Sequence, residues 1–107
     1  MSRDARVLGP MGDRIVMEND RVRIWEITIP SGADSNIHRH DLDYVLVILG
    51  GDRIAAVQED DTESTLPPYF EADVVPGQAV FVERGAVETA RNVGREPYSE
   101  IIIELKD

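Results

Sequence analysis

A chain of 107 residues that is 42% apolar has the size of one compact domain with a modest core. Its net charge of −10 argues against nucleic acids and anionic membranes as partners, because binding to phosphate groups requires clustered Lys and Arg. The absence of cysteine excludes disulfides, thiolate metal ligands and a thiol nucleophile. Because the first residues lack a signal-type apolar segment and no apolar run reaches about 20 residues, we expect a cytoplasmic protein.

In chain order, residues 1–12 are polar and rich in glycine, which predicts an N-terminal arm, loosely held unless a partner subunit pairs with it. Residues 13–107 form the predicted domain. Short apolar or alternating runs between Gly and Pro turns predict strands at residues 15–17, 21–29, 44–49, 53–58, 69–75, 79–82, 86–92 and 98–105. No stretch has helical periodicity beyond about one turn, so we expect an all-β sandwich or barrel.

Two details refine the predicted strands. In residues 21–29 the apolar alternation changes phase between Ile24 and Trp25, which predicts either burial on both faces or a β-bulge. The turn at residues 50–52, Gly-Gly-Asp, predicts that strands 44–49 and 53–58 pair as a hairpin. The acidic segment 59–68 ends in two prolines and is expected to be an exposed loop.

The only two histidines, His38 and His40, are one residue apart and directly precede the buried strand 44–49. Residues i and i+2 of a strand face the same side, so strand geometry at this point would direct both imidazoles into one space. Two convergent imidazoles suggest a metal site. Without cysteine or another histidine, any further protein ligand must be a carboxylate.

Glu88 is the first candidate for that carboxylate. Alternation in strand 86–92 places Glu88 on one face between Ala86 and Ala90, and small neighbours leave room inside a barrel. A buried carboxylate there requires a cation or strong hydrogen-bond donors. Asp43 is the second candidate, although its parity relative to the histidines is wrong unless the chain bends. The competing interpretation is a hydrogen-bonded polar cluster without metal.

These residues stand in a pattern that resembles the cupin superfamily. Gly32, five residues and then His38 and His40 resemble the start of the first cupin motif, and Asp43, six residues and Gly50 resemble its end. The second motif resembles the stretch from residue 77 to residue 92, with Gly77, Glu83, Arg84, Gly85, Glu88 and Asn92 at the matching spacings. Cupins usually carry glutamate at the position of Asp43, proline at that of Glu83 and histidine at that of Glu88.

The resemblance implies a double-stranded β-helix, or jelly-roll barrel, with metal ligands inside it. The set of two imidazoles and one carboxylate predicts a divalent transition metal, Fe(II) first and then Zn, Ni or Mn, held by His38, His40 and Glu88, with Asp43 as the further candidate ligand. The implied function is that of a metal-dependent enzyme with an oxygenase-type or an isomerase or lyase reaction; the alternative is a cupin that binds a ligand or metal without turnover. The expected partner molecules are a small oxygen-rich or anionic compound and a second copy of the chain in a homodimer.

Among the aromatic residues, Tyr44 shares the parity of the two histidines, so we expect it near the site. Trp25 and Phe81 are expected in the core. Arg39 and Arg91 are out of phase with the candidate ligands and are expected at the surface.

Overall fold

The computed structural model describes residues 6–107, and these residues form strands, turns and loops without a helix. No helix in this part of the chain is therefore long and apolar enough to cross a membrane. Within the described residues there are nine strands: β1 (Arg14–Glu18), β2 (Val22–Ile29), β3 (His38–Arg39), β4 (Tyr44–Gly50), β5 (Arg53–Gln58), β6 (Tyr69–Asp73), β7 (Ala79–Val82), β8 (Val87–Asn92) and β9 (Tyr98–Leu105).

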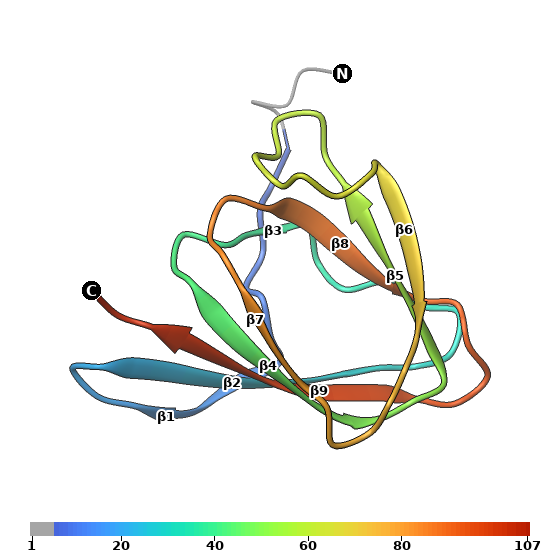
Figure 1. The fold of residues 1–107 in the computed structure, drawn as a ribbon, viewed down its shortest axis with the longest axis horizontal. Helices are drawn as coiled ribbons and strands as arrows, with labels where there is room; N and C mark the ends of the chain where they lie inside the picture. Colours follow the sequence, from blue (N-terminus) through green and yellow to red (C-terminus); the bar gives the residue numbers. More distant parts are fainter. Residues whose placement is uncertain (1–5) are drawn as a thin grey trace.

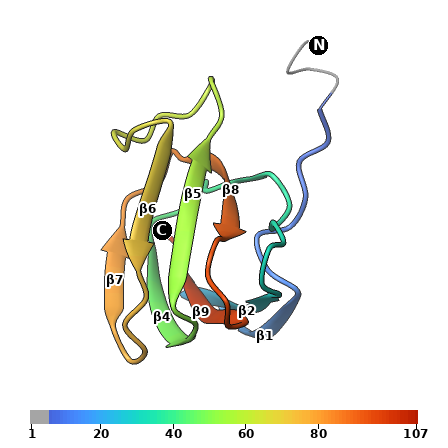
Figure 2. The same ribbon diagram turned by 90° about the vertical axis from the view of Figure 1, so that its right-hand side faces the viewer.

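The strands form two antiparallel sheets that enclose the interior of a barrel (Figures 1 and 2). The five-stranded sheet has the order β1-β2-β9-β4-β7, and the four-stranded sheet has the order β3-β8-β5-β6. The central strand β9 pairs with β2 along its whole length and with β4 on its other side. The predicted all-β jelly-roll architecture is confirmed.

The predicted hairpin between residues 44–49 and 53–58 is wrong. β4 pairs with β7 and β9, whereas β5 pairs with β6 and β8 in the other sheet. The glycines between them turn the chain from one sheet to the other, and Gly51 has the positive φ of 123° that this corner requires. A Cβ at Gly51 would also lie 3.0 Å from the ring of Tyr98, so the corner fits closely over β9.

Apolar side chains from the five-stranded sheet form most of the core between the sheets. The buried cluster consists of Met11, Ile27, Ile29, Tyr44, Ile48, Tyr98 and Ile102. Phe81, by contrast, is 59% exposed, because β7 lies at the edge of its sheet and this side chain does not face the interior. The expectation of a core position for Phe81 is therefore wrong.

The phase change in β2 corresponds to an irregularity in its neighbour. The pairing of β2 with β9 is regular from Val22 to Ile29, but the register of β1 against β2 shifts between Ile15 and Met17. Ile24 and Trp25, on opposite faces of β2, are both partly buried. The change in apolar phase thus reflects partial burial on both faces, and the bulge lies in β1.

The described part of the predicted arm, residues 6–12, lies against the barrel rather than loosely. Met11 belongs to the core cluster, and the amide of Gly9 donates to the carbonyl of Ile37 over 2.8 Å. Arg6 forms ion pairs with Glu59 and Asp61 of the acidic loop. Residues 1–5 lie outside the described part of the chain.

Candidate metal centre

The short strand β3 and its partner β8 place the predicted ligands on one surface. His38 lies directly opposite Glu88 in this antiparallel pair, and directly opposed residues point to the same face of a sheet. The pairing continues beyond β3, where the amide of His40 donates to the carbonyl of Ala86 over 2.9 Å. His40 therefore keeps the i, i+2 relation to His38 that strand geometry predicts, although β3 is separate from β4.

Gly85 makes this extension of the pairing possible. Its amide donates to the carbonyl of His40 over 2.9 Å, and its φ of 121° is unfavourable for a residue with a side chain. A Cβ at this position would also meet the Cβ of Glu63 at 3.0 Å. Glycine at position 85 thus supports the backbone that carries His40.

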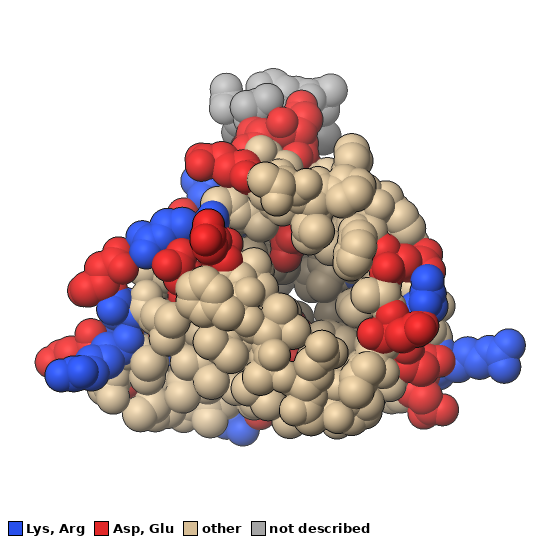
Figure 3. Space-filling model, viewed as in Figure 1, with Lys and Arg blue, Asp and Glu red and all other residues tan. Residues whose placement is uncertain are grey.

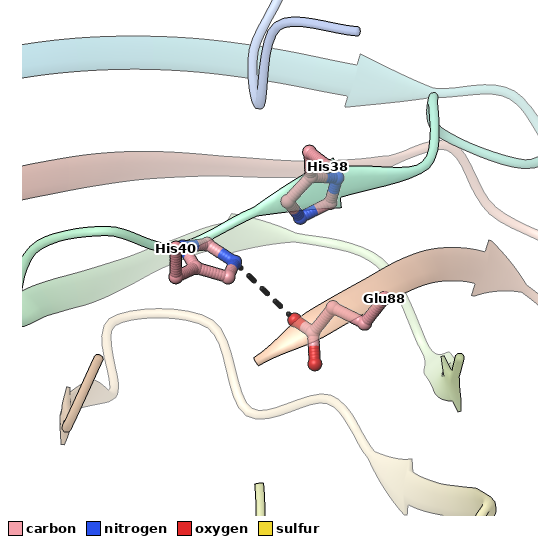
Figure 4. Close-up of side chains that lie close together, drawn as sticks. All are labelled: His38, His40 and Glu88. Atoms are coloured by element: carbon pink, nitrogen blue, oxygen red, sulfur yellow. Dashed lines mark ion pairs between the residues drawn. The ribbon is translucent and has the colours of Figure 1, made fainter. Parts of the chain in front are cut away.

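The three side chains converge. One possible ligand atom each from His38, His40 and Glu88 lies within 4.8 Å of the other two. Figure 4 shows the two imidazoles and the carboxylate directed toward a common space, with His40 Nε2 lying 3.4 Å from Glu88 Oε2. The two histidine rings meet edge to face with centroids 4.7 Å apart.

A hydrogen bond to the backbone fixes the tautomer of His38. Its Nδ1 lies 2.8 Å from the carbonyl oxygen of Asn36, an acceptor, so Nδ1 carries the proton and Nε2 retains its lone pair. Burial lowers the pKa of the His38 imidazole, and the neighbouring His40 lowers it further. A neutral imidazole with a free lone pair is the form that binds a metal ion.

Glu88 is held by a chain of hydrogen bonds. Gln58 donates from Nε2 to Glu88 Oε1 over 2.7 Å, and the Thr62 hydroxyl donates to Gln58 Oε1 over 2.7 Å. Burial alone would raise the pKa of the Glu88 carboxyl, but contacts with His40, Gln58 and His38 together lower it below its ordinary value. The carboxylate is thus kept ionised with Oε2 directed at the histidines.

His40 is fixed by packing more than by hydrogen bonds. Its ring stacks on that of Tyr44 with centroids 4.0 Å apart and an angle of 15° between the planes, which confirms the expected position of Tyr44. Its buried Nδ1 has no hydrogen-bond partner among residues 6–107. Two imidazoles and one ionised carboxylate are a donor set that can hold a divalent cation.

A cavity of about 130 Å³ adjoins the three residues. Its walls are mostly apolar and come from both sheets, and its polar lining comprises Ser35, His38, His40, Tyr44, Glu88, Tyr98 and Glu100. Figure 3 shows a hollow at the centre of the molecule, with acidic atoms visible inside it. The ligand atoms therefore face a space that a small molecule can enter.

Comparison with known proteins identifies the architecture. Neither a family model nor a curated protein sequence matches the chain. A cupin domain from Bordetella pertussis superimposes with a TM-score of 0.74 at 21% identity, covering 88% of this chain and 91% of its own. An RmlC-like cupin with a double-stranded β-helix fold from Methanocaldococcus jannaschii gives a TM-score of 0.68 at 17% identity, covering 99% and 86%. The protein has the cupin fold.

One further similar structure has a stated enzymatic activity. It is a DMSP lyase from Ruegeria pomeroyi, with a TM-score of 0.60 at 20% identity over 83% of this chain and 40% of the lyase. At these identities the similarity establishes the cupin fold alone.

Asp43, the second candidate ligand, does not belong to the group of converging side chains. Its carboxylate accepts hydrogen bonds from the backbone amide and Nε of Arg84, over 2.9 and 3.1 Å, and its side chain is 32% exposed. These contacts lower the pKa of Asp43. The chain does not bend enough after His40 to bring this residue onto the ligand face, so the structure places only His38, His40 and Glu88 together.

Sequence reasoning missed three polar residues of the cavity, Ser35, Tyr98 and Glu100. Alternation in strand 98–105 places Tyr98, Glu100 and Ile102 on one face, and the structure buries that face. Ile101 and Ile103 make the opposite face equally apolar, which hid the inward position of Glu100. A glutamate in phase with buried residues was nevertheless a usable signal.

Proposed function

We propose that this cupin is a metal-dependent enzyme for a small molecule, with His38, His40 and Glu88 as protein ligands to a divalent transition metal. The convergence of these three side chains beside a mostly apolar cavity is the observation that supports the proposal. Two imidazoles and one carboxylate suit Fe(II), Zn, Ni or Mn and leave coordination positions open. We place Fe(II) first because the set resembles the facial triad of non-haem iron oxygenases.

The surrounding residues have defined tasks in this proposal. Asn36 fixes the tautomer of His38, Gln58 orients Glu88, and Tyr44 holds the ring plane of His40. The bound metal would supply Lewis-acid or O2 chemistry to a substrate oxygen. With Glu88 ionised, the loaded site has a charge of about +1, which favours an anionic or chelating oxygen group.

An oxygenase-type reaction is the first choice, and an isomerase or lyase reaction is the second. The second choice gains support from Glu100, since a further carboxyl in the cavity offers a group that can exchange a proton with substrate. The DMSP lyase among the similar structures shows that a lyase can be built on this fold. Turnover that requires O2 in the iron-loaded protein supports the oxygenase; O2-independent turnover supports the isomerase or lyase.

Metal binding itself is tested on the purified chain. After reconstitution with Fe(II), Zn, Ni or Mn and removal of free metal, elemental analysis is expected to find about one ion per chain. Only trace amounts with every metal would contradict the proposal. Stoichiometric metal without turnover of any tested compound would favour a binding protein instead.

Glu88→Ala tests the ligand assignment. Loss of one of three ligands is expected to weaken the affinity for Zn at least 100-fold, as measured by competition with a chromophoric chelator. Asp43→Ala is the matched control, because it removes a carboxylate that binds Arg84 and lies outside the cluster. Equal affinities of the two variants would contradict the assignment of Glu88.

A further inference from the structure

Glu100 has a buried carboxyl group on the wall of the cavity that the five-stranded sheet forms. It lies on β9, in the middle of the five-stranded sheet, whereas His38 and Glu88 lie on β3 and β8 of the four-stranded sheet (Figure 1). Its exposed fraction is only 8%, yet it lines the same cavity as the three candidate ligands. It is not a member of the group whose ligand atoms lie within 4.8 Å of one another.

A second buried glutamate on the same face of β9, Glu104, has a carboxylate whose hydrogen-bond donors come from the protein. Glu104 is 2% exposed and accepts hydrogen bonds from Arg23 Nε over 2.7 Å and from Trp25 Nε1 over 2.6 Å. These two donors, one of them charged, account for its burial. The burial of the Glu104 carboxylate therefore requires no bound molecule.

Glu100 has no comparable set of partners. Within residues 6–107 its carboxyl has one hydrogen-bond partner, the hydroxyl of Tyr98, which donates to Oε2. Its cross-strand neighbours on β2 and β4 are Ile27 and Ile48, both apolar. A carboxylate can accept about four hydrogen bonds, so most of this capacity remains available on a surface that faces the cavity.

Burying a carboxyl with one partner is unfavourable, and an apolar residue would pack against the isoleucines at lower cost. Packing alone therefore does not explain the choice of glutamate at position 100. A bound molecule with a hydrogen-bond donor would supply the partner that the protein lacks.

We infer that Glu100 binds a hydroxyl group of the small molecule that occupies the cavity. The molecule has a compact apolar body, an oxygen function that reaches His38, His40 and Glu88, and a hydroxyl that donates to Glu100. The first oxygen function rests on the proposed metal site. The contact with Glu100 does not, because it requires only the cavity and the carboxyl.

The cavity limits the size of this molecule. A volume of about 130 Å³ is close to that of an apolar protein cavity known to hold benzene, at about 150 Å³. Apolar walls from both sheets, including Leu46, Ile54 and Phe70, suit a ring or a short branched chain. The inferred substrates are therefore small hydroxylated carbonyl or carboxylate compounds rather than sugars or polymers.

Phenol and benzene test the hydroxyl contact on the metal-free protein, because they differ by one hydroxyl group. In titrations followed by NMR, the wild type is expected to bind phenol about tenfold more tightly than benzene, the value of one good hydrogen bond. In Glu100→Leu this preference is expected to disappear. In Glu83→Leu, the control, it is expected to remain, because this is the same substitution at an exposed position outside the cavity lining.

Other outcomes are equally informative. An unchanged phenol preference in Glu100→Leu, or no binding of either compound to the wild type, would overturn the inference. Should the leucine variant fail to fold, Glu100→Gln keeps an acceptor for Tyr98 and is expected to reduce the preference at least threefold; no reduction would overturn the inference.

A second titration separates this inference from the proposed function. Benzoate, 3-hydroxybenzoate and 4-hydroxybenzoate are added to the Zn-reconstituted protein and to the metal-free protein. Tighter binding of all three compounds to the Zn-reconstituted protein supports the metal site. Tighter binding of a hydroxybenzoate than of benzoate supports the contact with Glu100, provided that this difference is lost in Glu100→Leu. A hydroxyl effect without a Zn effect would refute the proposed function and leave the role of Glu100 intact.

Discussion

At the scale of single residues, Glu100 couples the stability of the fold to pH. Burial raises the pKa of its carboxyl from 4.5 to about 7, although the Tyr98 hydroxyl and His40 act in the opposite direction, and Glu88 raises it further. The unfolded chain then binds fewer protons than the native state between these two values. The contribution of Glu100 to the free energy of unfolding is therefore lost as pH rises from about 4.5 to about 7.

Glu100→Gln is expected to remove this pH dependence. Each unit of pKa difference corresponds to about 1.4 kcal/mol, so the variant should gain about 3 kcal/mol over the wild type between pH 4.5 and pH 8. The measurement is urea unfolding of both metal-free proteins across this range. The lowered pKa of His38 has the opposite effect below pH 6.5, but both proteins contain it, so the difference between them isolates Glu100. Parallel stability curves would contradict this prediction.

At the scale of secondary structure, three neighbouring strands build the candidate metal centre. β3 supplies His38, β8 supplies Glu88, and β5 supplies Gln58 directly opposite Glu88 in the antiparallel register. Directly opposed residues share a face, which explains why the Gln58 amide reaches the carboxylate. The order β3-β8-β5 thus places ligand, ligand and supporting residue side by side.

Gln58→Leu tests this support from β5. Without the amide, Glu88 loses the donor that orients its carboxylate, and the affinity for Zn is expected to fall about 10- to 100-fold by chelator competition. Gln78→Leu, the same substitution at an exposed turn position, serves as the control and is expected to leave the affinity unchanged. An equal, small effect of both changes would show that Glu88 is held without Gln58.

At the scale of the whole molecule, local patterns in the sequence predicted the positions of the strands better than the pairing between them. Alternation and turn residues are local signals, whereas the pairing of β4 with β9 joins segments about fifty residues apart. The Gly-Gly turn therefore predicted a hairpin where the chain changes sheets. Glu88 was predictable because its own strand shows a small-residue face. The position of Asp43 depends on the path of the chain after His40, which spacing alone does not determine.

The expected homodimer is also argued from the whole molecule. β1 forms one edge of the five-stranded sheet, and its apolar residues Ile15, Val16 and Met17 are exposed. An exposed apolar edge strand is suited to pairing with a second copy. We predict a homodimer through β1 by light scattering at physiological salt, and a monomer for Val16→Lys. Thr65→Lys, in the exposed loop, should remain dimeric; a monomeric wild type or a dimeric Val16→Lys would contradict the prediction.

The division of the cavity between two sheets gives this barrel a modular architecture. The proposed ligands and Gln58 lie on the four-stranded sheet, whereas Tyr98, Glu100 and Ile102 lie on the five-stranded sheet, and the hydrogen-bond ladders of the two sheets are separate. Side-chain changes on β9 can therefore alter which molecule fits without disturbing the strand pairing that positions the histidines. A protein engineer could therefore diversify side chains on β9 for selectivity while keeping the four-stranded sheet, and Tyr44 on β4, constant.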